Sequence, residues 1–325
     1  MANAALDAIN RLLRQPLGVE KNLKAIATAI QEFLGANKDP MAHPPRNHHK
    51  EIQTVDDMRA ILSTLESDDI RKDSFAVPLL KVLKVLLRKQ ANRTALGGRG
   101  VHVVTDLMSS ACLDSISCEC ANVILNMCYD AGNVLHFLKE GGVDALGPLI
   151  RSGKENLQAS ASGLGALQSV CFDKPGRDAT RGDGIIGAVV RLLNDTSPKV
   201  RARALGTVHN LSTDARSIGT IREEGGLPRL IALLRSHEAQ VCGGAAGTIQ
   251  NLSREERSRA MLTDFGAVEP LADLLVGRHV KSQQISAAGA LVNVIGPGVC
   301  DTNRRLLHSV LTDGIVLGVV ESCMI

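Results

Sequence analysis

The sequence predicts an all-α fold in which similar helical units stack into a solenoid. Two short phrases, GTVHNLS from Gly206 and GTIQNLS from Gly247, differ at two positions and lie 41 residues apart. Related phrases recur along the chain at steps of 43, 41, 41 and 42 residues; they end at Asn126, Ser169, Asn210, Asn251 and Asn293. Self-similarity at a period of this length is typical of a repeat architecture. The absence of strands alternating with helices argues against a sheet-based fold.

A glycine that precedes a short apolar segment is a second, independent sign of the same period. It occurs at Gly141, Gly184, Gly225 and Gly266, at steps of 43, 41 and 41 residues. The longer step falls in the same repeat as the longer step of the first motif. A weaker, earlier copy begins at Gly100. The agreement of the two motifs indicates that the period is a property of the fold.

Residues 215–255 show the pattern of one unit. A short segment is followed by a glycine pair, which allows a sharp turn. Apolar side chains at Leu230, Leu233 and Leu234 then follow the helical period of 3.6 residues. A polar turn leads to a longer helix over residues 240–253 that is rich in Ala and Gly. Because one such unit can cover its apolar faces only with neighbouring units, the pattern requires stacking.

The motifs GGLPRLIALL at residues 225–234 and AAGTIQNLS at residues 245–253 resemble the armadillo repeat family. SAAGALVNVI at residues 286–295 matches the family as well, and the resemblance extends over about residues 75–297. It implies a right-handed superhelix, or α-solenoid, of three-helix units. It also implies that proteins bind along a concave groove lined by the third helices.

The resemblance and the period together predict the domain organisation. Residues 1–34 are expected to form two amphipathic helices and residues 35–50, which contain Gly, Pro and His, a linker loop. Residues 51–90 are expected to be a degenerate N-terminal repeat or cap, and residues 298–325 a C-terminal capping partial repeat, because terminal repeats are atypical. Between them we expect five repeats, over residues 91–131, 132–173, 174–214, 215–255 and 256–297.

The resemblance gives the recurring asparagines a role. It implies that Asn126, Asn210, Asn251 and Asn293 bind the backbone of an extended peptide, and Ser169 departs from this pattern. The chemistry is suitable, because an amide side chain donates and accepts hydrogen bonds and can bind a peptide unit whatever its side chain. In the alternative interpretation, the same asparagines bond to neighbouring backbone and stabilise the stack.

The position four residues before each of these side chains differs from that of import receptors of the importin alpha type, which carry Trp there. This chain contains no Trp. The residues at this position are Asn122, Gly165, Gly206, Gly247 and Gly289. Recognition of nuclear signals in the importin manner is therefore disfavoured. The glycines either leave the groove floor open to a partner backbone or helix, or allow adjacent third helices to pack closely.

A second comparison concerns charge. Beta-catenin-like grooves carry a line of Lys and Arg, whereas here Lys199, Arg201 and Arg203 form one basic cluster. We expect this cluster to give a local preference for acidic partners; the alternative is a solvated helix start. The net charge of +3 excludes no partner class.

The remaining motifs carry no chemistry that the sequence supports. GDGIIG at residues 182–187 matches a dinucleotide-binding fingerprint formally, but no strand precedes it. The chain shows no recognisable catalytic motif, and we expect neither a metal nor a cofactor. Cys112, Cys118, Cys120 and Cys128 lack the spacing of a zinc site and are predicted to be small buried thiols. His43, His48 and His49 are expected in a solvated loop.

The sequence thus predicts a non-enzymatic scaffold or adaptor that binds partner proteins through extended segments or helices. We expect no nucleic acid, membrane or small-molecule substrate, since no stretch of 18 apolar residues occurs and no basic footprint is present. Eight cysteines without a disulfide framework indicate a cytoplasmic location, with the nucleus, cilium or cytoskeleton also open. A structural role in a cytoskeletal or ciliary assembly is the main alternative, and the missing Trp array counts against a transport receptor.

Overall fold

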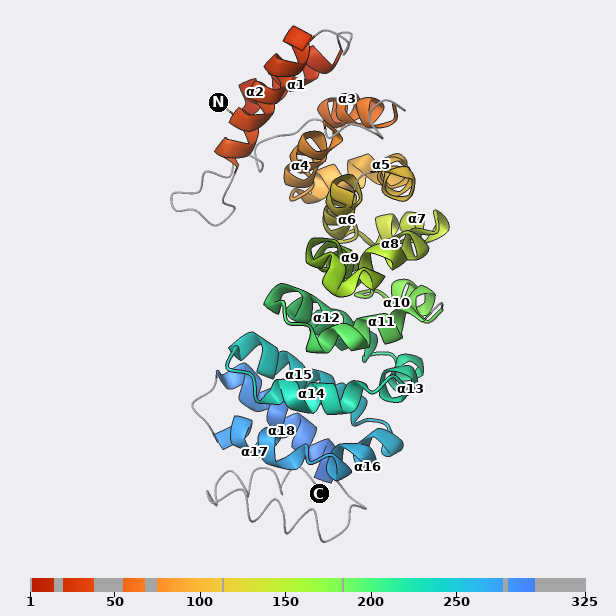
Figure 1. Ribbon diagram of the computed structural model, residues 1–325, viewed down its shortest axis with the longest axis vertical. Coiled ribbons are helices and arrows are strands. Elements are labelled where there is room, and N and C mark those ends of the chain that lie inside the picture. Colours follow the sequence, from red (N-terminus) through yellow and green to blue (C-terminus); the bar gives the residue numbers. More distant parts are fainter. Residues whose placement is uncertain are drawn as a thin grey trace. The chain divides into compact units, whose positions relative to one another are not determined.

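The computed structural model describes residues 2–14, 20–37, 55–67, 75–112, 114–182, 184–276 and 280–295 (Figure 1). These residues form helices joined by short turns, and no strand occurs among them. The fold is an all-α armadillo-repeat solenoid. The chain divides into two compact units, residues 1–179 and residues 180–325, which we call the N-terminal unit and the C-terminal unit.

The N-terminal unit begins with four helices that precede the regular repeats. They are α1 (Ala2–Leu13), α2 (Glu20–Ala36), α3 (Val55–Leu65) and α4 (Ala76–Leu86). The helices α1 and α2 pack against each other through buried apolar side chains that include Ile9, Ile26 and Phe33. Two amphipathic helices were expected here, although α2 continues two residues beyond the predicted boundary. The rest of the predicted linker, with its histidines, lies outside the described residues, as does the predicted cap at residues 298–325.

The regular repeats follow as sets of three helices. In the N-terminal unit they are α5 (Gln90–Ser110), α6 (Asp114–Met127), α7 (Ala131–Lys139), α8 (Gly142–Arg151), the 3-10 helix η3 (Gly153–Glu155) and α9 (Leu157–Val170). The division between the units falls within α10 (Lys174–Thr180). In the C-terminal unit they are α11 (Ile185–Arg191), the 3-10 helix η4 (Leu192–Asn194), α12 (Pro198–Leu211), α13 (Ala215–Glu223), α14 (Gly226–Leu234), α15 (Ala239–Leu252), α16 (Glu256–Asp264), α17 (Val268–Val276) and α18 (Lys281–Ile295).

The turn between the first and second helix of a repeat depends on a glycine. Gly141, Gly184, Gly225 and Gly266 have φ angles of 67°, 67°, 77° and 75°, which is the left-handed region that disfavours side chains. The periodic glycine of the sequence is therefore a backbone requirement. Its earliest copy was misplaced. Gly97, with φ of 52°, makes the break inside α5, whereas Gly100 is buried within the helix.

The third helix of each repeat packs on the third helix of the next one within a unit. In the N-terminal unit α6 lies between α4 and α9, and in the C-terminal unit α15 lies between α12 and α18 (Figure 1). These helices carry small residues at their contacts, which permits close approach. The surfaces that remain uncovered on the third helices form the candidate site.

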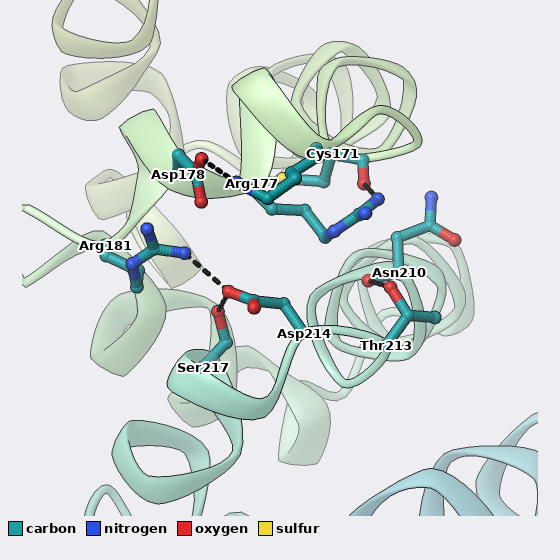
Figure 2. Close-up of polar contacts among 9 residues, drawn as sticks. Cys171, Arg177, Asp178, Arg181, Asn210, Thr213, Asp214 and Ser217 are labelled. Atoms are coloured by element: carbon teal, nitrogen blue, oxygen red, sulfur yellow. Dashed lines mark hydrogen bonds and ion pairs between the residues drawn. The ribbon is translucent and has the colours of Figure 1, made fainter.

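Side chains from the following helix cap the carbonyl end of several third helices. Arg93, Arg177 and Arg259 each donate from Nη1 to the carbonyls six and five residues earlier, at distances of 2.6–3.2 Å. Figure 2 shows Arg177 reaching the carbonyl of Cys171. Asn92 and Asn133 donate from Nδ2 to the carbonyl six residues earlier, at 2.8 and 3.1 Å. Cations and amide donors stabilise such helix ends, where carbonyls lack partners.

Candidate functional site

The predicted asparagines lie on the third helices, and three of them bond to the preceding helix of the stack. Asn126 Nδ2 donates to the carbonyl of Lys84 at 3.0 Å. Asn293 Nδ2 donates to the carbonyl of Gln250 at 3.1 Å. Asn251 is buried, and its Nδ2 donates to Ser212 Oγ at 3.0 Å. These contacts are those of the stacking alternative; peptide binding by these side chains stays a prediction.

The other members of the predicted site differ in exposure. Ser169 is buried in α9, so a partner cannot reach its side chain without rearrangement. Asn122 and Asn210 are half-buried. The carbonyl of Asn210 accepts a bond of 2.7 Å from Thr213 Oγ1 (Figure 2). The side chains at this recurring position therefore differ in exposure from repeat to repeat.

One member of the basic cluster on α12 makes contacts that hold the repeats together. Arg201 donates from Nη2 to Glu238 Oε1 at 2.9 Å and from Nη1 to the carbonyl of Asp195 at 3.0 Å. It thus bridges two repeats, and binding of an acidic partner by Arg201 stays a prediction. Lys199 is exposed and Arg203 is half-buried. Of the three basic side chains, only that of Lys199 is exposed.

Two glycines at the position of the importin Trp are covered by side chains of the preceding repeat. A Cβ added at Gly247 would lie 3.3 Å from His209 Cε1, and one added at Gly289 would collide with the Gln250 amide. The floor is therefore not open at these two positions. The glycines allow close packing between adjacent third helices, and the half-buried side chains of His209 and Gln250 lie against them.

His209 has a defined set of contacts in this arrangement. Its Nδ1 lies 3.3 Å from Thr248 Oγ1, and Thr248 Oγ1 in turn donates to the carbonyl of Gly244 at 2.7 Å. Burial lowers the pKa of His209 from its ordinary value. The imidazole is accordingly neutral at pH 7.

Two exposed aromatic side chains were missed in the sequence. Tyr129 is 66% exposed and Phe172 is 75% exposed, in a chain with one Tyr and five Phe. Each lies three residues after a member of the recurring column, Asn126 or Ser169, so both occupy one repeat position. The guanidinium carbon of Arg93 lies 5.9 Å from the Tyr129 ring centroid. The repeat alignment would have revealed the pair, because it places the two rings in register.

Ion pairs between the first helices of successive repeats join the repeats of the C-terminal unit. Arg181 pairs with Asp214, which also accepts from Ser217 Oγ at 3.4 Å (Figure 2). Arg222 pairs with Glu255 in the same way, one repeat further on. These pairs span 33 residues each and hold neighbouring repeats together.

The cysteines in and next to α6 differ in exposure. Cys118, Cys120 and Cys128 are buried as predicted, and burial raises the pKa of Cys118 to about 11 and those of the other two thiols further above the ordinary value. Cys112 is exposed, which corrects the prediction of four buried thiols. Within the described part of the chain, no three His, Cys, Asp or Glu side chains are grouped as a metal site.

Comparison with known proteins supports the repeat class. The armadillo/beta-catenin-like repeat model matches residues 214–254. A comparison with curated proteins gave no match. An engineered protein of the Northeast Structural Genomics Consortium is similar in structure, with a TM-score of 0.72 and 19% identity over 99% of this chain and 83% of its own.

Two designed proteins are similar as well. The designed armadillo repeat protein YIII(Dq)4CqI has a TM-score of 0.66 and 18% identity over 72% of this chain and 98% of its own. The designed armadillo repeat protein YIII(Dq.V1)4CPAF, in complex with the peptide (KR)4, has a TM-score of 0.65 and 18% identity over the same shares. The chain has the armadillo-repeat fold and carries an armadillo/beta-catenin-like repeat at residues 214–254. None of the described helices is long and apolar enough to cross a membrane.

Proposed function

We propose that this chain is a protein-interaction scaffold that binds segments of partner proteins along the third helices of its armadillo repeats. The observation that carries the proposal is the pair of exposed rings, Tyr129 and Phe172, at one position of adjacent repeats. Exposed aromatic side chains that lie in register are costly to leave in water and are enriched at the energetic centres of protein interfaces. No catalysis is part of this proposal.

Two further observations support it. Half-buried polar side chains, including His209 and Gln250, follow the third helices of the C-terminal unit at the repeat period. They offer hydrogen bonds to a bound backbone. A similar designed armadillo repeat protein is in complex with the peptide (KR)4, so this fold can hold a peptide. The identity of that peptide is not transferred to this chain.

The test uses a defined probe, a phage-displayed library of random dodecapeptides panned against the full chain. We expect enriched peptides whose affinity falls at least about tenfold when Tyr129 and Phe172 are both changed to Ala, since aromatic anchors often contribute 2 kcal/mol or more. Phe265→Ala is the matched control, because Phe265 is a 46% exposed ring at the end of α16. It should leave affinity unchanged.

The proposal fails if the library yields no enriched peptide. It also fails if the enriched peptides bind the double variant as tightly as the wild-type chain. A loss of the same size in Phe265→Ala would show nonspecific binding to exposed rings and would count against the proposal. The exposed rings contribute little to the core, so circular dichroism should show all three proteins equally folded.

A further inference from the structure

The position of the proton on His209 follows from its neighbours. Thr248 has one hydroxyl hydrogen, and it donates that hydrogen to the carbonyl of Gly244 at 2.7 Å. Toward His209 Nδ1, at 3.3 Å, the same oxygen can therefore only accept. The proton of the neutral imidazole is on Nδ1, and Nε2 carries a lone pair.

The other ring nitrogen, Nε2, is not engaged by the described helices. Nε2 of His209 has no hydrogen-bond partner among the described residues. The ring is half-buried on α12 beside Gly247, which has no side chain to cover it. Burial lowers the pKa of the ring, which favours its neutral form. The ring thus presents a neutral hydrogen-bond acceptor in partly nonaqueous surroundings.

This chemistry restricts what can bind there. A carboxylate or a carbonyl would place a second acceptor against the lone pair and be repelled. A cation would lose hydration against a neutral ring that carries no counter-charge. A neutral N–H donor is compatible, and every non-proline residue of a peptide carries one on its main chain.

We propose that His209 is a specificity-determining residue that accepts a hydrogen bond, through Nε2, from a main-chain N–H of the bound peptide segment. The inference rests on the proposed function and adds the direction of one hydrogen bond, in which the peptide donates and the chain accepts. Gln250, which occupies the same position in the next repeat, presents an amide that can donate as well as accept. The Nε2 atom of His209 can instead only accept a hydrogen bond. It therefore requires that a donor group of the peptide faces α12.

The binding test uses the same dodecapeptide library, panned on the full chain after depletion on His209→Asn. The shorter amide of that variant keeps a donor near Thr248 but has no atom at the place of Nε2. We expect peptides that bind the variant about tenfold more weakly than the wild-type chain, the loss of one neutral hydrogen bond. Methylating one main-chain nitrogen of such a peptide should cause the same loss in the wild-type chain and no further loss in His209→Asn. Arg216→Ala, an exposed change on α13, is the control and should bind normally.

A second measurement needs no ligand. Nitrogen-15 NMR of the histidine-labelled chain, assigned by the disappearance of one ring signal in His209→Asn, should show the Nδ1–H tautomer at pH 7.5. A ring protonated on Nε2 overturns the inference, and so does depletion that leaves no His209-dependent peptide. In the second case, undepleted peptides that still depend on Tyr129 and Phe172 would leave the proposed function intact. Insensitivity to N-methylation at every position would overturn the main-chain assignment.

Discussion

Gly225 gives the sharpest test of how the repeat turns. Its φ of 77° lies in the left-handed region, which costs a residue with a side chain about 1–2 kcal/mol. A Cβ added there meets no heavy atom within 4 Å, so the cost of Gly225→Ala is backbone strain and not collision. Gly219, in the neighbouring helix α13, is the matched control. A Cβ there would lie 3.8 Å from Arg222 Nη2, an ordinary contact in a helix, where Ala is favoured by about 0.5–1 kcal/mol.

Comparing the two variants removes the effect of the unfolded chain. Both replace Gly by Ala, so the lost freedom of the unfolded state is common to them and cancels in the difference. Gly225→Ala should therefore be less stable than Gly219→Ala by at least about 1–2 kcal/mol. Urea unfolding followed by circular dichroism measures this difference. Repeat arrays need not unfold in one step, so hydrogen exchange in α14 should show whether the loss of stability lies in this repeat. Equal midpoints for the two variants would refute the left-handed turn at Gly225.

Three further predictions concern the contacts between helices. Asn251→Ala removes the buried bond to Ser212 and should lower the free energy of unfolding by about 1–2 kcal/mol in urea; an unchanged midpoint would contradict the stacking role. Arg259→Met removes the donor to two helix-end carbonyls and should cost about 1 kcal/mol by the same assay, with faster hydrogen exchange at the end of α15. The pKa of His209 is lowered in the fold, so the unfolded chain binds the proton more readily. The stability it contributes is complete above the ordinary histidine pKa, and it is lost as pH falls below that value and through the lowered pKa of the folded chain. Thermal midpoints from pH 8 to 5 should fall more steeply for the wild-type chain than for His209→Gln, and parallel curves would contradict this.

Local backbone requirements were predictable from the sequence. The φ value of a turn residue is a property of that residue, and only Gly adopts the left-handed region without cost. The four periodic glycines therefore located four turns correctly. The first turn was misplaced because LGGRG offers several glycines in five residues, and the choice of Gly97 over Gly100 depends on how the flanking segments of α5 pack.

Side-chain partners were less predictable. The sequence placed Asn126, Asn251 and Asn293 on the third helices, but two roles were open because the partner depends on the rotation of one helix against the next. The structure directs each Nδ2 toward the preceding helix. Likewise, the sequence showed that Gly247 replaces a Trp, yet only packing reveals that His209 covers it. The distances between helices depend on tertiary packing, which a repeat motif alone does not determine.

In the armadillo stack, some repeat positions hold the fold and others are exposed to solvent. The left-handed glycines form the turns within the repeats and Asn251 bonds to the preceding repeat, so a change there is expected to alter stability. The position three residues after the recurring column has no such duty: it holds exposed Tyr129 and Phe172 in one unit, and exposed Thr213 and Arg254 in the other. Because this position is exposed, substitutions there are expected to change the surface without unfolding the chain. Under the proposed function, specificity is therefore expected to reside in such positions, and the recurring repeat motif is expected to contribute mainly to stability.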